Sequence, residues 1–280
     1  MMQGNVSRDI VALTPFERQV TSAIDALLVV ATSAVILGWI FGHPILYTPS
    51  APVVSPFTAF SLLVLTLVRE ARLHAREWPV SLNFAMTGLV LGGNVSSILM
   101  LAMMPPELWA SFSGIVLTSV MTSIGLIFFC LYDFAIVFRE TPQSGFLLDD
   151  MILHLALAPG GVSLLGYLLG NPTYLSVHAD PRVGISLFEI FLMALYAVAA
   201  VISNPRLFLW SFLAANWTNR IIFGGLFANQ FVAPLIVAVL LSGHGSKGPG
   251  IELFVMLAGV VATMSFLLLQ ARVQRSQLAT

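Results

Sequence analysis

Residues 54–79, VSPFTAFSLLVLTLVREARLHAREWP, join an apolar stretch directly to a basic segment. A helix of roughly 20 apolar residues crosses a bilayer core about 30 Å thick. Residues 54–69 supply most of such a helix, and Pro56 suits its first turn, where the missing N–H costs nothing. The basic segment that follows carries Arg69, Arg72 and Arg76. Because Lys and Arg are enriched in cytoplasmic loops, the sequence predicts a transmembrane helix that ends on the cytoplasmic side.

The composition of the whole chain agrees with a membrane location. Of its 280 residues, 58% are hydrophobic and only 9% are charged, whereas soluble domains carry about 25% charged residues. The net charge is −1, and no basic stripe is present for nucleic acid. These values exclude an ordinary soluble enzyme, a disordered regulator and a nucleic-acid-binding protein. The lipid bilayer is therefore the expected main partner.

Eight stretches are long and apolar enough to span a bilayer, so we expect an all-α, polytopic transmembrane bundle. The predicted spans are 20–41, 54–69, 79–104, 110–138, 147–170, 184–203, 221–242 and 251–271. We expect one integral membrane domain over residues 1–280. It comprises a cytoplasmic segment (1–19), the helical bundle (20–271) and a cytoplasmic tail (272–280).

The distribution of basic residues sets the expected orientation. With both termini in the cytoplasm, ten of the twelve Lys and Arg residues face inward, and only Arg182 and Lys247 face outward. Residues 204–220 are predicted to form an amphipathic helix at the cytoplasmic interface, because a ninth span would move Arg272 and Arg275 outside. A re-entrant segment is the alternative. The expected interface anchors are Trp210, Trp217 and Arg220.

Two of the predicted spans contain similar sequences. Residues 55–70, SPFTAFSLLVLTLVRE, share a Ser-x-x-Thr start and an Arg-Glu ending with SVMTSIGLIFF (119–129) and the following VFRE (137–140). This pattern indicates either a duplicated helix pair or chance similarity. The repeated start and the final LLLQARVQRSQLAT (267–280) resemble the amino-terminal multi-helix input domains of bacterial sensor kinases and diguanylate cyclases. The resemblance implies a location in the bacterial cytoplasmic membrane. No kinase or cyclase sequence follows Thr280, so either the output lies on another chain or the resemblance reflects shared membrane composition.

Ionisable residues within spans are candidates for function because burying them in lipid is costly. Asp133 lies six residues before Arg139, and it either reaches the cytoplasmic interface as a structural group or binds an ion. Glu189 lies near the outer end of its span. It either pairs with Arg182 or, if buried in the bundle, carries a proton.

Asp150 and His154 are four residues apart and share a helical face. The pair could bind a cation or relay protons, because imidazole titrates near neutral pH. The alternative is a helix start at which acidic side chains complement the helix dipole. Asn83 and Asn94, with Thr87 near them, fall on one face of span 79–104, a pattern typical of side chains that join helices.

Pro159 lies in the middle of a span, so we expect a kink there, because its ring clashes with the carbonyl group four residues earlier. With Gly160 and Gly161 it forms a candidate helix break that frees backbone groups for a ligand. No phosphate-binding loop, zinc-protease motif or nucleophile elbow is present. We therefore expect no catalytic residue, no metal and no cofactor.

Three functions remain open from the sequence. The first is a sensory or regulatory module that acts through a partner on the cytoplasmic side, or as a homo-oligomer. The second is a transporter or channel for a small solute or ion. The third is an accessory subunit of a larger membrane complex.

Overall fold

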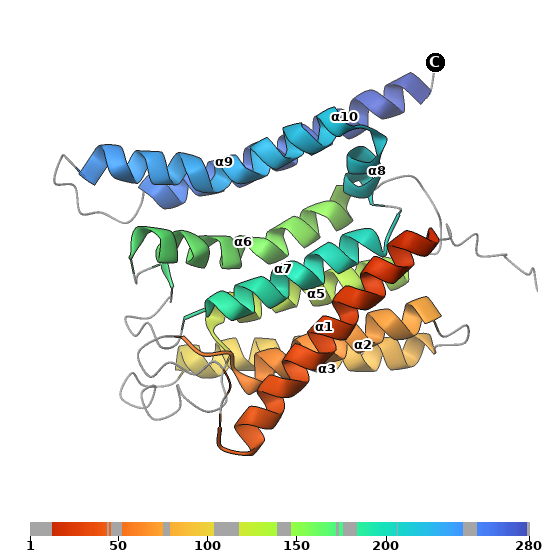
Figure 1. Cartoon of the computed structure of the whole chain (residues 1–280), viewed down its shortest axis with the longest axis vertical. Coiled ribbons are helices and arrows are strands. Elements are labelled where there is room, and N and C mark those ends of the chain that lie inside the picture. Colours follow the sequence, from red (N-terminus) through yellow and green to blue (C-terminus); the bar gives the residue numbers. More distant parts are fainter. Residues whose placement is uncertain are drawn as a thin grey trace, which may run out of the picture.

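The computed structural model describes residues 13–43, 45, 52–74, 79–103, 118–138, 147–171, 174–175, 184–205, 207–242 and 251–278. Within these ranges every regular element is an α-helix (Figure 1), which confirms the all-α prediction. The helices are α1 (Pro15–Ile40), α2 (Pro56–His74), α3 (Val80–Met103), α5 (Val120–Phe138), α6 (Leu147–Leu169), α7 (Leu187–Ile202), α8 (Phe208–Ala215), α9 (Trp217–Ser242) and α10 (Ile251–Leu278).

Six of these helices are long and apolar enough to cross a membrane: α1, α3, α5, α6, α9 and α10. Helix α7 is apolar but shorter, with 16 residues. Helix α2 has 19 residues, and its last turns carry charged side chains. Large apolar side chains lie exposed along the outer helices, as expected of a surface that faces lipid. These features indicate an integral membrane protein built as a helical bundle.

The ends of five helices differ from the predicted spans by four residues or more. Helix α5 begins at Val120 and not at 110, with residues 110–117 outside the described part of the chain, and α9 begins at Trp217 and not at 221. Helix α1 begins at Pro15, because the Thr14 side chain and Glu17 form a reciprocal capping box. Helix α2 continues to His74, and α10 continues to Leu278. Arg69 and Arg72, which we assigned to a loop, are therefore helical residues. The assignment was wrong because a charge after an apolar run can also be buried against another helix.

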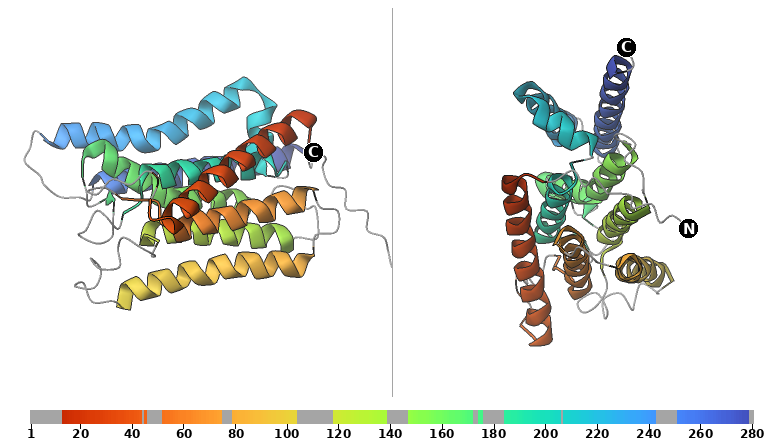
Figure 2. Two further views of the ribbon diagram at one scale, coloured as in Figure 1. Left: turned by 60° about the horizontal axis from the view of Figure 1, so that its bottom comes forward. Right: turned by 90° about the vertical axis from the view of Figure 1, so that its right-hand side faces the viewer.

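The long helices run side by side, and α8 lies at one end of the bundle in Figure 1. Helices α1, α3, α6 and α9 begin at this end, and helices α2, α5, α7 and α10 end there. We call this the α8 end. Helix α1 packs on α2 and α7, while α3 packs on α5 and α2. Helix α6 lies between α5 and α7 on one side and the α9–α10 hairpin on the other (Figure 2). The largest apolar core joins α1, α2, α5, α6 and α7.

The predicted amphipathic helix over 204–220 is corrected to two elements. Helix α8 has only 8 residues, and Asn216 then adopts an extended backbone before α9 begins at Trp217. The Asn216 side-chain oxygen accepts a hydrogen bond from the Asn219 N–H at 2.8 Å. Asn216 thus caps a new helix. The apolar residues before and after Asn216 therefore belong to two different helices, α8 and α9.

Pro159 lies inside α6, and α6 changes direction near its middle in Figure 1. The two glycines after it contact other helices. A Cβ atom on Gly161 would lie 3.1 Å from Met256 Cε, and one on Gly160 would lie 3.7 Å from Ile190 Cγ2. The helix surface at these glycines is therefore a packing contact with α10 and α7. A second proline inside a helix, Pro234 in α9, was not singled out from the sequence.

Candidate functional site

Glu189 lies in the first turn of α7 and is only 1% exposed. Its carboxylate accepts hydrogen bonds from the Ser186 N–H at 3.0 Å and from the Ser55 N–H at 3.4 Å. The first bond belongs to a capping box, in which the Ser186 hydroxyl accepts from the Glu189 N–H at 3.1 Å. The second bond connects the start of α7 to the start of α2. Glu189 therefore joins two helix amino termini that are far apart in sequence.

A cluster of hydroxyl groups connects this place to α5. Ser55 Oγ lies 3.0 Å from Thr58 Oγ1 and 3.3 Å from Thr118 Oγ1. Thr118 lies just before α5, whose start repeats the motif of α2, because Ser119 Oγ lies 2.8 Å from Thr122 Oγ1. The similar sequences at 55 and 119 thus form the same local structure, a serine cap over the first turn.

The helix amino termini around Glu189 partly offset the cost of burying its carboxylate. Helix amino termini carry a partial positive charge, and Glu189 accepts hydrogen bonds at two of them. Among the described residues no Lys, Arg or His forms an ion pair with Glu189. Arg182, the partner considered from the sequence, lies outside the described residues. A buried carboxylate surrounded by hydroxyl groups is chemically suited to hold a proton or a small cation.

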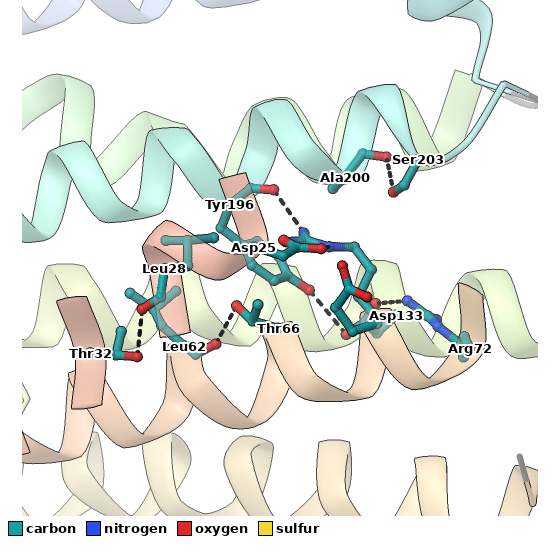
Figure 3. A network of polar contacts seen from close by, with 12 residues as sticks. Asp25, Leu28, Thr32, Leu62, Thr66, Arg72, Asp133, Tyr196, Ala200 and Ser203 are labelled. Atoms are coloured by element: carbon teal, nitrogen blue, oxygen red, sulfur yellow. Dashed lines mark hydrogen bonds and ion pairs between the residues drawn. The ribbon is translucent and has the colours of Figure 1, made fainter. Parts of the chain in front are cut away.

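A second buried group of polar residues lies nearer the α8 end (Figure 3). Arg69 forms an ion pair with Asp25, and its Nη1 donates to the Tyr196 carbonyl oxygen at 3.0 Å. Arg72 Nη2 lies 2.7 Å from Asp133 Oδ1, and the Tyr196 hydroxyl donates to Asp133 Oδ2 at 3.2 Å. We call these five residues the charge cluster. It joins α1, α2, α5 and α7.

The charge cluster contains two guanidinium groups and two carboxylates, so its formal charges cancel. The Arg69 guanidinium also lies over the Tyr196 ring, 4.3 Å from its centroid, which is a favourable cation–π geometry. Such mutual pairing is typical of a structural network. The structure thus places Asp133, a candidate from the sequence, in a paired and buried position. Asp25 was not identified from the sequence, although an acidic residue inside a predicted span is itself a signal.

The structure gives Asp150 and His154 separate partners. Asp150 accepts hydrogen bonds from the Phe208 N–H at 3.1 Å and from the Leu209 N–H at 2.9 Å. It therefore caps the start of α8 from a different helix. His154 lies one turn deeper, with Nε2 at 3.4 Å from Gln230 Nε2 of α9. These contacts give no support to joint cation binding by the two residues.

Gln230 connects α6 to both helices of the α9–α10 hairpin. Its Nε2 donates to Thr263 Oγ1 of α10 at 2.8 Å, and both side chains are buried. With the His154 contact, this gives a short polar chain across three helices. Gln230 was not identified from the sequence, because an amide in an apolar span is a weak signal without its neighbours.

The three predicted interface anchors lie in different environments. Trp210 packs against the main core, and its indole N–H donates to Glu17 Oε1 at 3.1 Å. It therefore holds α8 against the start of α1. Trp217 is 70% exposed, and Arg220 Nε donates to the Leu213 carbonyl oxygen at 2.8 Å. Trp217 and Arg220 are both exposed, as an interfacial anchor requires, whereas Trp210 is partly buried.

Comparison of the chain with protein-family models, with curated proteins and with solved structures gives no match. Within the described part of the chain, no group of three or more His, Cys, Asp or Glu side chains is placed to hold a metal ion.

Proposed function

We propose that the protein is a sensory or regulatory membrane module that passes a conformational signal to a partner on the cytoplasmic side. The observation that supports this most is the length of α10. Its apolar part ends at Val273, but the helix continues without a break to Leu278. A rigid helix that leaves the bundle transmits displacement of its membrane part. The final residues also carry the resemblance to sensor input domains.

The proposal includes eight membrane crossings with both termini in the cytoplasm. In addition to the six long apolar helices, α2 and α7 run alongside them through the bundle (Figure 2). The α8 end is then the cytoplasmic end, because the predicted inward-facing basic residues gather in segments that lie there. We place the protein in the bacterial cytoplasmic membrane on the resemblance alone.

The contact between the bundle and α10 suits a signalling role. Helices α9 and α10 pack mainly on each other, on α6 and on the short α8, where Phe212 of α8 joins Leu267 and Ala271 of α10 in one apolar cluster. The polar chain His154–Gln230–Thr263 crosses this contact. A movement of α6 therefore changes the position of α10 through few intermediate side chains.

Site-specific photo-crosslinking in native cells tests this proposal. A photoreactive amino acid at Ser276, an exposed position near the end of α10, is expected to trap one partner that carries a signalling domain. The same amino acid at Leu269, which is 60% exposed within the apolar part, serves as the control. Equal products from both positions would contradict the proposal. Gln230→Leu is expected to lower the yield from Ser276.

A second function, transport of protons or a small cation, is favoured by the surroundings of Glu189. A buried carboxylate with hydroxyl groups nearby and no described ion-pair partner is the kind of group that exchanges a proton or binds a cation. Flux into proteoliposomes that is lost in Glu189→Gln and kept in Glu252→Gln would support transport. Flux that is absent from the wild-type protein would exclude it.

A further inference from the structure

Several polar side chains buried in the bundle have atoms without a hydrogen-bond partner among the described residues. Four of them belong to α3 and α5, which pack together and against α2. They are Asn83, Thr87, Asn94 and Ser123, each at most 1% exposed. Native proteins satisfy nearly all buried polar groups, and where protein partners are missing they use ordered water.

The unpaired atoms nearer the α8 end lie at the same height along the bundle, which follows from counting residues along the packed helices. We call such a height a level. Asn94 Nδ2 lies 3.3 Å from Ser61 Oγ, which aligns α3 with α2. The two helices run in opposite directions (Figure 1), so moving eleven residues along each brings Asn83 level with Arg72. Both Asn83 side-chain atoms and Arg72 Nη1 are unpaired. Thr87 lies one turn from Asn83 on the same face, and its hydroxyl is unpaired too.

A second level of unpaired atoms lies near the middle of α3. The Phe84 and Phe134 rings stack with centroids 5.4 Å apart, which aligns α3 with α5. Counting eleven residues back along α5 reaches Ser123, and counting ten forward along α3 reaches Asn94. Ser123 Oγ and Asn94 Oδ1 are unpaired. The two levels are eleven residues apart along α3, which corresponds to about 16 Å of helix.

We infer that the interface of α2, α3 and α5 holds internal water at these two levels, the first beside Arg72 and Asn83 and the second beside Asn94. Between the levels the same face of α3 carries Val90, a buried residue of the main apolar core, so the two water sites are separate. Apart from the Arg72 guanidinium, the unpaired groups are amides and hydroxyls, which donate or accept hydrogen bonds but carry no charge. Such a lining suits water and not a bare ion. Each water needs two to four polar partners, and Asn83 with Thr87 provides three unpaired atoms within one turn.

The first level, beside Arg72 and Asn83, is the one that connects to outside water. Arg72 is the one charged residue at its edge with partial exposure, because its side chain is 19% exposed while that of Asp133 is fully buried. Water therefore enters at the α8 end, beside the Arg72–Asp133 ion pair. Beside Asn94, a Cβ atom on Gly93 would lie 2.3 Å from the Phe57 ring. The Phe57 ring thus packs tightly against α3 next to the second level. This inference does not depend on either proposed function.

X-ray hydroxyl-radical footprinting of the whole protein in lipid nanodiscs tests for water at the first level, because the radicals form from water at the place where it is bound. Met86 precedes Thr87 and is partly buried. We expect its oxidation to be several-fold faster than that of Met256, which is buried in an apolar cluster. Asn83→Leu and Thr87→Val are each expected to slow the oxidation of Met86 several-fold.

Thr66→Val is the matched control, because the Thr66 hydroxyl is buried but donates to the Leu62 carbonyl oxygen at 2.7 Å. This variant is expected to leave the oxidation of Met86 unchanged. Oxidation of Met86 as slow as that of Met256 would overturn the inference. It would also be overturned if Thr87→Val had no effect, or if Thr66→Val had the same effect. Thr87→Val preserves side-chain shape, so it decides the test should Asn83→Leu not fold.

Discussion

At the scale of single residues, Arg69 shows how the bundle holds a charge away from water. Its guanidinium contacts the Asp25 carboxylate, the Tyr196 carbonyl oxygen and the Tyr196 ring. Removing one partner of a buried ion pair leaves an uncompensated charge. The contribution of this pair is therefore best seen by comparing single and double substitutions.

We expect Asp25→Leu to lower the free energy of unfolding by about 3–5 kcal/mol, because Arg69 then lies buried without its carboxylate. The double variant Asp25→Leu/Arg69→Met is expected to recover most of this loss. Unfolding in mixed detergent micelles, followed by circular dichroism, gives both values. A double variant as unstable as Asp25→Leu would show that the pair is not the cause.

Asp150 supplies a second prediction for a single residue, because it caps α8 through two backbone N–H groups. Asp150→Ala is expected to cost about 1 kcal/mol and to speed hydrogen exchange in α8. Asp150→Asn keeps an oxygen that accepts a hydrogen bond, so it should retain most of the protection. Hydrogen exchange with mass spectrometry reports on α8 directly. Equal protection in Asp150→Ala and the wild-type protein would exclude the capping role.

At the scale of elements, two glycines make opposite predictions. A Cβ atom on Gly125 of α5 would lie 2.8 Å from the Ala156 carbonyl oxygen of α6, whereas one on Gly92 of α3 would have no neighbour within 4 Å. Gly125→Ala is expected to destabilise the bundle by about 1–3 kcal/mol through overpacking. Gly92→Ala should stabilise it slightly, because alanine favours the helix. Thermal unfolding of both variants in detergent tests the difference.

The sequence predicted helices well and their partners poorly, for a physical reason. Apolar stretches determine where a helix can cross lipid, so residues 147–170 were predicted within a residue of α6. The pairing of Asp25 with Arg69 depends on how α1 packs against α2, because the two residues are 44 positions apart in sequence. No local pattern contains that information. The same holds for Asp150, which looks like a cap for its own helix but caps α8.

At the scale of the whole molecule, the proposed orientation predicts the side on which each terminus lies. Green fluorescent protein fused after Leu278 is expected to fluoresce, because this terminus lies in the cytoplasm. Alkaline phosphatase fused at the same position is expected to be inactive. Fusions after His244, in the connection between α9 and α10, should show the reverse. Matching results at both positions would contradict the crossing of the membrane by the α9–α10 hairpin.

The ion pair between Asp25 and Arg69 also constrains how the chain is synthesised. Insertion of a lone aspartate at the centre of a transmembrane helix costs about 2.5–3.5 kcal/mol on the translocon scale. Helix α1 leaves the ribosome 44 residues before Arg69 is available to Asp25. The cost of holding this carboxylate in lipid is therefore offset only once Arg69 arrives with α2. We expect the first two helices of this protein to settle in the bilayer as a pair.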